Sequence, residues 1–298
     1  QMMKEAQEGR LKAMFIIGEN PMVSDPDLKH ARKSLEKLDF LVVQDIFMTE
    51  TAQLAHVVLP SASFAEKDGT FTNTERKVQR VRKAVASPGE AKEDWKIICD
   101  LSSRMGYPMA YDSAKTIFEE IGRLTPSYCG INFGRLERDG IYWPCTGTEH
   151  PGTPCLHMDQ FTCGLGVFHA IEWIPPAEVP DEVYPLYLTT GRVLYQYHTG
   201  SMTMRSEGLN RLSPECFVEL SPGDAGRFGL KDGQQVRVLS RRGQIKTRAK
   251  VSEKAVDGTL FIPFHWALAA ANELTNTALD PIAKIPELKV CAVRIEAA

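Results

Sequence analysis

The first sixty residues combine short apolar runs with one amphipathic stretch. Apolar side chains recur at helical spacing from Leu28 to Leu38, behind the polar, proline-containing turn 24–27, which is typical of a capped helix with one buried face. The apolar runs are short enough to be buried strands and lie at 13–18, 40–47 and 56–60. Strands separated by helical segments predict a parallel sheet with crossover helices, an α/β arrangement.

The middle of the chain is less regular. Residues 61–82 are polar and predict a loop or hairpin. Helical spacing returns behind Asp94 and again at 114–124. From 125 to 184 the chain is rich in Pro, Gly, Cys and Tyr and has little periodicity, so we expect an ordered connection between domains.

After Tyr184 the pattern changes to period two. Apolar residues alternate with polar ones through 235–239 and 244–251, on either side of a glycine-containing turn, which predicts a β-hairpin. Further short strands and one helix at 223–228 favour a small mixed β-barrel. The fold class expected is therefore α/β followed by mixed β. The predicted division is 1–124, an inter-domain connection at 125–183, and a barrel domain at 184–298.

Composition excludes several classes of protein. The net charge of −3 and the absence of long like-charged blocks argue against a nucleic-acid partner. No run approaches the roughly twenty apolar residues of a membrane span, and no secretory signal is visible. The seven cysteines are odd in number and irregularly spaced, which indicates reduced thiols and a cytoplasmic location.

Two common kinds of ligand motif are weak. Cysteines and histidines crowd the stretch 145–169, but without paired spacing they are better interpreted as packing residues than as a metal site. The sequence Gly164-Leu165-Gly166 lacks the third glycine of a dinucleotide fingerprint and follows no clear strand. An ordinary NAD or ATP site is therefore disfavoured.

Polar residues follow the first two predicted strands. The turn Gly18-Glu19-Asn20-Pro21 ends the first strand, and Gln44 and Asp45 end the second. Ligands of parallel sheets lie beyond the carboxyl ends of the strands, so this edge is a candidate binding site. Asn20 as a turn residue and Asp45 as a cap are the alternative interpretation.

Several longer blocks resemble a known family. They are TGRVLYQYHTGSMTMR at 190–205, FHWALAAANELTN at 264–276 and PELKVCAVRIE at 286–296. Together they resemble the C-terminal, pterin-binding part of the molybdenum and tungsten bis(molybdopterin guanine dinucleotide) oxidoreductases. The block GIYWPCTGTEHPGTPCLH at 140–157 is similar to an insert of formate dehydrogenases, and 221–243 resembles the double-psi barrel of this family. The resemblance implies a Rossmann-like sheet domain followed by a double-psi β-barrel.

The resemblance also implies which residues bind the cofactor. One guanine dinucleotide would be held by Asn20, Gln44 and Asp45, with further contacts from Lys67 and Asp94. The second pterin and its phosphates would be reached by a set in the barrel domain: Thr190, Gly191, Arg192, His198, Thr199, Phe264, Asn272 and Lys289. Arg and Lys suit phosphate oxygens, and Asp and Asn suit a guanine edge or a ribose. Gln196 departs from the family, in which His is frequent at this position.

The function implied is oxidation of formate to CO2, or the reverse. The cysteine cluster for a 4Fe-4S centre and the cysteine or selenocysteine metal ligand belong to a part not seen in this sequence, so we expect no catalysis by this chain alone. The partners implied are the N-terminal part of the same subunit and electron-transfer subunits. A nitrate reductase-type enzyme and a non-catalytic pterin-binding scaffold are the alternatives.

Overall fold

A computed structural model describes residues 1–298, which form two compact units. One unit contains residues 1–58 and 173–298, and the other contains residues 59–172. The predicted boundary at Leu124 does not coincide with this division, because residues on both sides of it pack into one core. None of the helices has the length and apolarity needed to cross a membrane.

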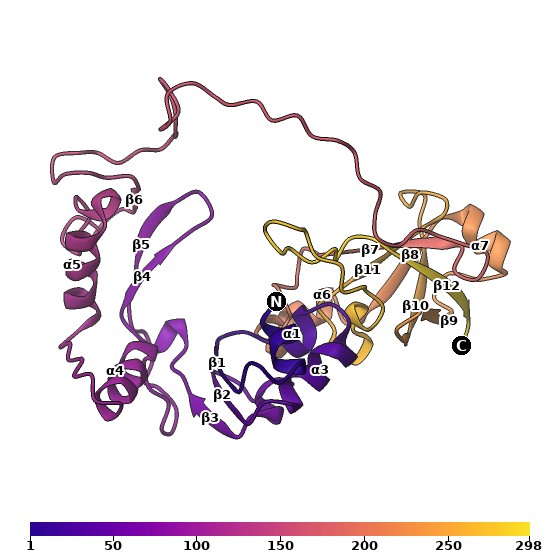
Figure 1. The fold of residues 1–298 in the computed structure, drawn as a ribbon, viewed down its shortest axis with the longest axis horizontal. Helices are drawn as coiled ribbons and strands as arrows, with labels where there is room; N and C mark the ends of the chain where they lie inside the picture. Colours follow the sequence, from indigo (N-terminus) through magenta and orange to yellow (C-terminus); the bar gives the residue numbers. More distant parts are fainter. The chain divides into compact units, whose positions relative to one another are not determined.

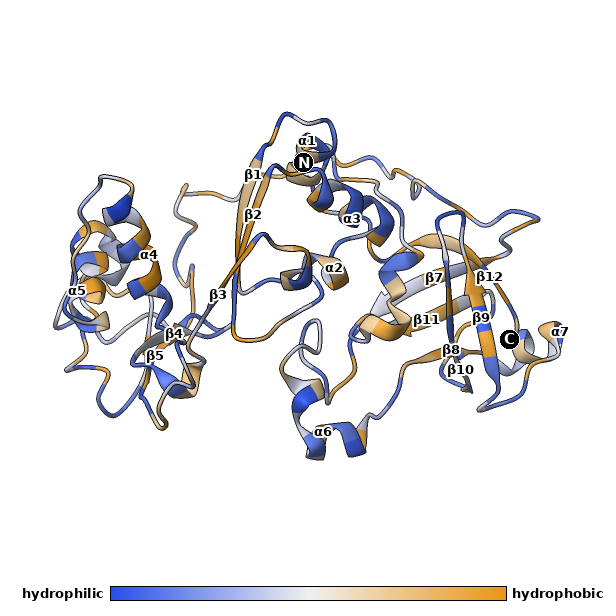
Figure 2. Ribbon diagram, turned by 90° about the horizontal axis from the view of Figure 1, so that it is seen from below, coloured by the Kyte–Doolittle hydropathy of each residue, from blue (hydrophilic) through white to orange (hydrophobic).

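The α/β part of the first unit agrees with the strand and helix pattern. It runs α1 (Met2–Gln7), β1 (Ala13–Ile17), α2 (Pro21–Ser24), α3 (Leu28–Glu36), β2 (Phe40–Asp45), the 3-10 turn η1 (Ala52–Leu54) and β3 (Val57–Pro60). The sheet order is β1-β2-β3, and β1 and β2 are parallel with Ile17 opposite Gln44 (Figure 1). Both strands are among the most hydrophobic parts of the ribbon in Figure 2.

Helix α3 shows why this part folds as its pattern indicates. Asp27 caps the helix, with its side chain accepting a hydrogen bond from the backbone N–H of His30 at 3.3 Å. Leu28, Ala31 and Leu35 are buried along one face, so the helix covers apolar surface and leaves its charged face in water.

The C-terminal part of the first unit is a closed six-stranded barrel. Its strands are β7 (Leu186–Gly191), β8 (Phe217–Leu220), β9 (Gln235–Leu239), β10 (Gln244–Val251), β11 (Thr259–Pro263) and β12 (Cys291–Ala297). They are ordered β10-β8-β11-β7-β12-β9. The β7–β11 and β8–β10 pairs are parallel and the other pairs are antiparallel, which confirms the expected mixed barrel.

The β9–β10 hairpin carries the period-two pattern into the barrel interior. Val236, Val238, Ile245, Thr247 and Ala249 are all buried, while the residues between them face outward. The short elements around the barrel are η4 (Thr203–Arg205), α6 (Glu207–Leu212), α7 (Pro222–Phe228), η5 (Ala267–Ala269) and η6 (Ala271–Glu273).

The second unit has its own core. It contains η2 (Phe64–Glu66), the hairpin β4 (Gly69–Thr72) and β5 (Lys77–Val81), α4 (Asp94–Arg104), α5 (Ala114–Leu124), η3 (Pro126–Tyr128) and β6 (Ile141–Tyr142). The core side chains are Val78, Phe118, Ile131, Phe133, Leu136, Ile141 and Cys145. The first part of the stretch expected to be a connection, through Cys145, is therefore packed structure, whereas most residues from 155 to 183 are exposed. Its burial comes from aromatic contacts between segments distant in sequence, such as Phe118 with Phe133, which leave no periodic signal.

Candidate functional site

Three segments of the barrel meet at the end of β7. Thr190 and Gly191 pair with Ile262 and Pro263 at the end of β11. The Thr190 hydroxyl donates to the Leu288 carbonyl at 2.7 Å, and Lys289 Nζ donates to the Thr190 carbonyl at 2.5 Å. The residues predicted from separate sequence blocks thus lie together at one end of the barrel.

Phe264 is the centre of a cationic and aromatic cluster. The Arg192 guanidinium carbon lies 6.0 Å from the centre of the Phe264 ring, and the His198 ring meets it edge-on with centroids 6.0 Å apart. The side chain of Arg192 is exposed and makes no ion pair in this structure. Its charge is consequently available to an anionic ligand.

His265 bonds to two points of the segment between β7 and η4, which carries Arg192 and His198. Its Nε2 accepts from the backbone N–H of Val193 at 3.0 Å, and its Nδ1 donates to the His198 carbonyl. The ring is fully buried, and burial lowers its pKa below the usual 6.5. The sequence analysis did not include His265 in the site. The signal that could have found it is its position directly after Phe264, within the cofactor-like block at 264–276.

Thr199 and Gln196 have their polar atoms engaged within the barrel domain. Thr199 Oγ1 lies 2.9 Å from Ser201 Oγ. Gln196 is buried, donates to the Ser213 carbonyl at 3.3 Å and accepts from Thr203 Oγ1 at 2.6 Å. Gln196 therefore holds the segment between β7 and α6 together, a role for which a titrating group is not required.

At the sheet end, Asn20 is buried and hydrogen-bonded on both sides of its amide. Its Nδ2 donates to Glu50 Oε2 at 2.8 Å, and its Oδ1 accepts from the hydroxyl of Thr51 at 2.7 Å and from that residue's backbone N–H at 3.2 Å. Gln44 is fully buried at the end of β2, where its carbonyl accepts from Gly18 N–H. The parallel pairing brings Asn20 and Gln44 to one edge of the sheet, as expected.

Asp45 lies beside them and caps the turn that follows β2. Its Oδ1 accepts from the backbone N–H of Ile46 at 2.7 Å and of Phe47 at 3.2 Å. Burial raises the pKa of this carboxyl group, while the backbone hydrogen bonds and the positive charge of Arg205 oppose the shift. The guanidinium carbon of Arg205 lies 4.1 Å from the centre of the Phe47 ring. A barrel-domain cation is thereby brought to the sheet end.

Asn272 connects the barrel domain to the α/β part of the same unit. Its Nδ2 donates to the Val23 carbonyl at 2.8 Å and the Ser24 carbonyl at 3.2 Å, and it is almost completely buried. Its Oδ1 accepts from Thr275 Oγ1 at 3.2 Å. Asn272, although distant in sequence, thus caps the C-terminal end of α2 and connects the barrel end of the site to the sheet end.

Lys67 and Asp94 belong to the second unit and form an ion pair with each other. Both side chains are partly buried, at 23% and 33% exposure. The structure thus brings this predicted pair together, while the other predicted contacts lie in the first unit.

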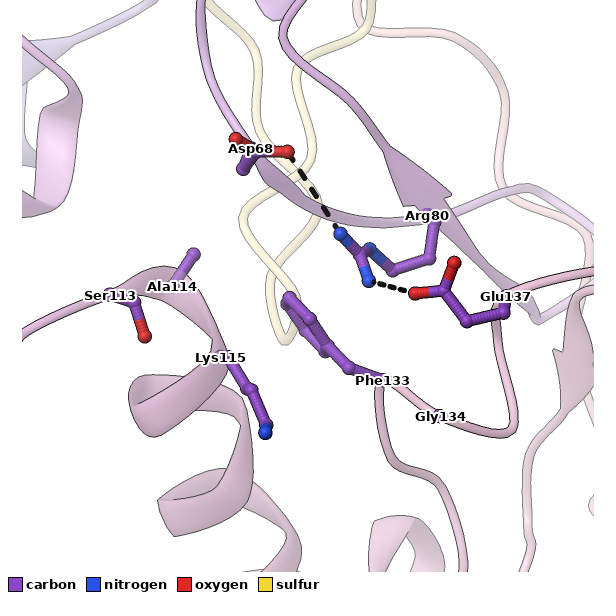
Figure 3. Close-up of a pocket in the computed structure, with 8 residues that line it drawn as sticks. All are labelled: Asp68, Arg80, Ser113, Ala114, Lys115, Phe133, Gly134 and Glu137. Carbon is purple, nitrogen blue, oxygen red and sulfur yellow. Dashed lines mark hydrogen bonds and ion pairs between the residues drawn. The ribbon is translucent and has the colours of Figure 1, made fainter.

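A cavity of about 530 Å³ in the second unit is lined by polar groups that already have partners. Arg80 lies between Asp68 at 3.9 Å and Glu137 at 2.8 Å, and its guanidinium carbon is 3.9 Å from the centre of the Phe133 ring (Figure 3). Glu137 also pairs with Arg82 at 2.9 Å, and Lys115 in the lining pairs with Glu119 at 3.8 Å, so each charged group of the lining already has a partner of opposite charge.

The cysteine- and histidine-rich stretch does not assemble a metal site. No group of three or more His, Cys, Asp or Glu side chains is placed to hold a metal ion. Cys145 is buried and donates to the His150 carbonyl at 3.3 Å. That contact makes Cys145 a packing residue of the second unit.

The donor set at the barrel end suits an anionic cofactor. Arg192 and Lys289 supply positive charge, and Phe264 supplies an apolar surface for a ring. Thr190 and Gly191 are buried at the end of β7, where Gly191 leaves room for the Phe261 ring. Such groups fit a phosphate-bearing pterin nucleotide, and they include no set of metal ligands.

Comparison with known proteins agrees with this assignment. The model described as "Molybdopterin oxidoreductase" matches residues 1–104, and the "Molydopterin dinucleotide binding domain" matches residues 186–292. The chain is 53% identical over 290 residues to the F420-dependent formate dehydrogenase subunit alpha of Methanocaldococcus jannaschii, covering 96% of the chain and 43% of that protein. It is 42% identical over 308 residues to the assimilatory nitrate reductase catalytic subunit of Bacillus subtilis, covering 99% of the chain and 43% of that protein.

The fold has a solved counterpart. Acetylene hydratase from Pelobacter acetylenicus superimposes with a TM-score of 0.77 at 21% sequence identity, covering 100% of the chain and 46% of that protein. The chain therefore spans less than half of the length of each of these proteins. On these two family matches, the chain contains a molybdopterin oxidoreductase segment and a molybdopterin dinucleotide-binding domain.

Proposed function

We propose that this chain is the cofactor-binding part of a formate dehydrogenase, which interconverts formate and CO2 at a bis(molybdopterin guanine dinucleotide) centre holding molybdenum or tungsten. The observation that carries the proposal is the 53% identity to a formate dehydrogenase alpha subunit through nearly the whole chain. The cationic cluster at the barrel end supports it, since the cofactor is anionic.

The barrel end would bind one pterin nucleotide. Arg192 would bind a phosphate, and Lys289 would join it by exchanging or sharing its hydrogen bond to the Thr190 carbonyl. Phe264 would cover one face of the pterin, with His198 and Thr199 on the adjoining loop. As part of the same proposal, the six-stranded barrel has double-psi topology and the parallel sheet is Rossmann-like.

The sheet end would bind the guanine of the other nucleotide. Asp45 presents a carboxylate whose second oxygen can accept from a guanine edge, while Asn20 and Gln44 shape the strand ends from inside. Lys67 would contact the cofactor together with Asp94, so that the pair contributes little net charge.

When bound, the metal centre of such a cofactor would supply the two-electron chemistry. The residues of this chain would bind and orient the cofactor. We expect no metal ligand and no iron–sulfur centre from this chain, and hence no formate oxidation by this polypeptide alone. The N-terminal part of the same subunit would supply both, and electron-transfer subunits would be further partners.

The test is an analysis of the complete protein from its source. Molybdenum or tungsten and released guanine nucleotide are expected, together with formate-dependent reduction of a viologen that is absent from the isolated chain. Nitrate-dependent oxidation of reduced viologen without formate activity would replace the proposal by a nitrate reductase, which the similarity to the B. subtilis enzyme makes the second candidate. Absence of both metal and nucleotide would favour a non-catalytic scaffold.

A further inference from the structure

The segment between β7 and η4 carries two of the candidate contacts at the barrel end, and it contains no strand. It begins with a turn that holds Arg192. Further along the same segment is the His198 loop, in which the backbone of His198 is left-handed with φ 50°. A non-glycine residue in that conformation is strained and persists only when its surroundings hold it there. Gly200, two residues on, has φ 71°.

His265 is the side chain that bonds to both the Arg192 turn and the His198 loop. Its Nε2 accepts from Val193, next to Arg192, and its Nδ1 donates to the carbonyl of the strained His198. One ring can make both bonds only as the neutral form with the proton on Nδ1. The ring is fully buried. Its centre lies 4.8 Å from the centre of the Phe264 ring and 5.7 Å from that of the Trp266 ring, which it meets edge-on.

We propose that His265 is a positioning residue, which locks the Arg192 turn to the His198 loop and so holds the cofactor contacts of the barrel end in one arrangement. The cofactor role rests on the proposed function, whereas the lock itself is a property of the chain. His265 is buried behind Phe264 and acts through the backbone of its neighbours.

The lock is sensitive to pH in one direction. Protonation of Nε2 removes the acceptor for Val193 and places a cation near Arg192 and His198, the two groups whose positive charge acts on the ring. Because the folded-state pKa lies below 6.5, the histidine's contribution is complete above that pH. It is lost as the pH falls from 6.5 through the folded pKa.

Two substitutions separate the two bonds. His265→Gln places an acceptor near the Nε2 position and keeps Val193 bonded, while the bond to His198 is lost. His265→Asn places a donor near the Nδ1 position and keeps the His198 carbonyl bonded, while Val193 is released. His265→Ala removes both. His56→Asn is the matched control, since His56 Nδ1 accepts from the backbone N–H of Leu41 at 2.9 Å, away from this site.

The experiment is hydrogen exchange on the complete protein, resolved at the amides of Val193 and Gly200. The Gly200 amide reports on the His198 loop because it donates to the Tyr197 carbonyl. Exchange at Val193 should rise about tenfold in the Asn and Ala variants and stay near wild type in the Gln variant. Exchange at Gly200 should rise in the Gln and Ala variants only, and neither amide should respond to His56→Asn.

In wild type, protection of Val193 should fall as the pH drops below 6.5, after correction for the intrinsic exchange rate, and this dependence should vanish in the Gln variant. Equal exchange in all His265 variants, or a pH dependence that survives in the Gln variant, would overturn the lock. Guanine nucleotide retained after gel filtration is the second readout and should be lowest in the Ala variant. If the exchange rates change as expected but the protein contains no guanine nucleotide, the positioning role of His265 stands and the proposed cofactor is refuted.

Discussion

The barrel end and the sheet end of the first unit use their polar side chains in different ways. At the sheet end, Asn20 is buried and hydrogen-bonded to Glu50 and Thr51. At the barrel end, Arg192 is exposed and its guanidinium makes no ion pair. Residues implied by one resemblance thus divide into those that shape the chain and those that can meet a ligand. Substitutions at the two ends should therefore affect different measurements.

The largest expected effect is on cofactor binding by Arg192→Ala. Loss of a charge-assisted hydrogen bond to phosphate should lower retention of guanine nucleotide by about tenfold or more. The unfolding free energy should change by less than about 0.5 kcal/mol, because the side chain is exposed. Nucleotide released per protein, measured after gel filtration, checks the first value. Arg294→Ala, at an exposed arginine on β12, is the control and should leave nucleotide content unchanged.

Asn20→Ala should show the opposite behaviour. It leaves the backbone N–H and hydroxyl of Thr51 without their partner, and this should lower the unfolding free energy by about 1–3 kcal/mol. Chemical denaturation of the single and double variants with Thr51→Val gives the coupling between the two side chains. Independent effects of the two substitutions would contradict the structural role assigned to Asn20.

Lys67→Met tests whether a cation in an ion pair contributes less to nucleotide binding than a cation without an ion-pair partner. The pair with Asp94 is partly exposed, so its loss should cost at most about 1 kcal/mol of stability. Nucleotide retention should fall less than in Arg192→Ala, because Asp94 beside Lys67 already offsets most of its positive charge. Retention equal to or lower than that of Arg192→Ala would remove the distinction. The variant Asp94→Asn is the control for the pair itself.

The smallest effect is expected from Asp45→Asn. The raised pKa of Asp45 means that its charged form is disfavoured in the folded state, so neutralising it should increase stability at neutral pH by less than about 1 kcal/mol. Asparagine retains the oxygen that accepts from Ile46 and Phe47. The gain should shrink as the pH falls through the raised folded-state pKa and vanish below 3.8, where the wild-type carboxyl is protonated in both states. Thermal unfolding of cofactor-depleted protein at several pH values measures it, and a loss of stability at neutral pH would contradict the assignment.

The local elements could be predicted from the sequence to within a few residues. The strands at 13–18 and 40–47, the helix at 114–124 and the barrel hairpin all occur where the pattern indicated. The helix and the hairpin follow periodic apolar patterns, and the two strands are short apolar runs, so both signals are properties of the sequence. The stretch after Leu124 has no such pattern, because its core comes from contacts such as that of Tyr128 with Trp143, which leave no periodic signal.

The sequence determined which polar and charged side chains are present, and the tertiary structure decided which of them are bonded within the chain and which are exposed to a ligand. The sequence alone named Arg192, Asn20 and Asn272 as polar groups suited to a nucleotide. Only the fold decided that Asn272 would bond to the backbone of α2, that Asn20 would be enclosed and that Arg192 would stay exposed. The fold also determined the role of His265, because it brings this ring into contact with Val193 and His198, which precede it by about seventy residues in the chain. Hydrogen-bond partners depend on which segments become neighbours in space, and a residue type does not specify its neighbours.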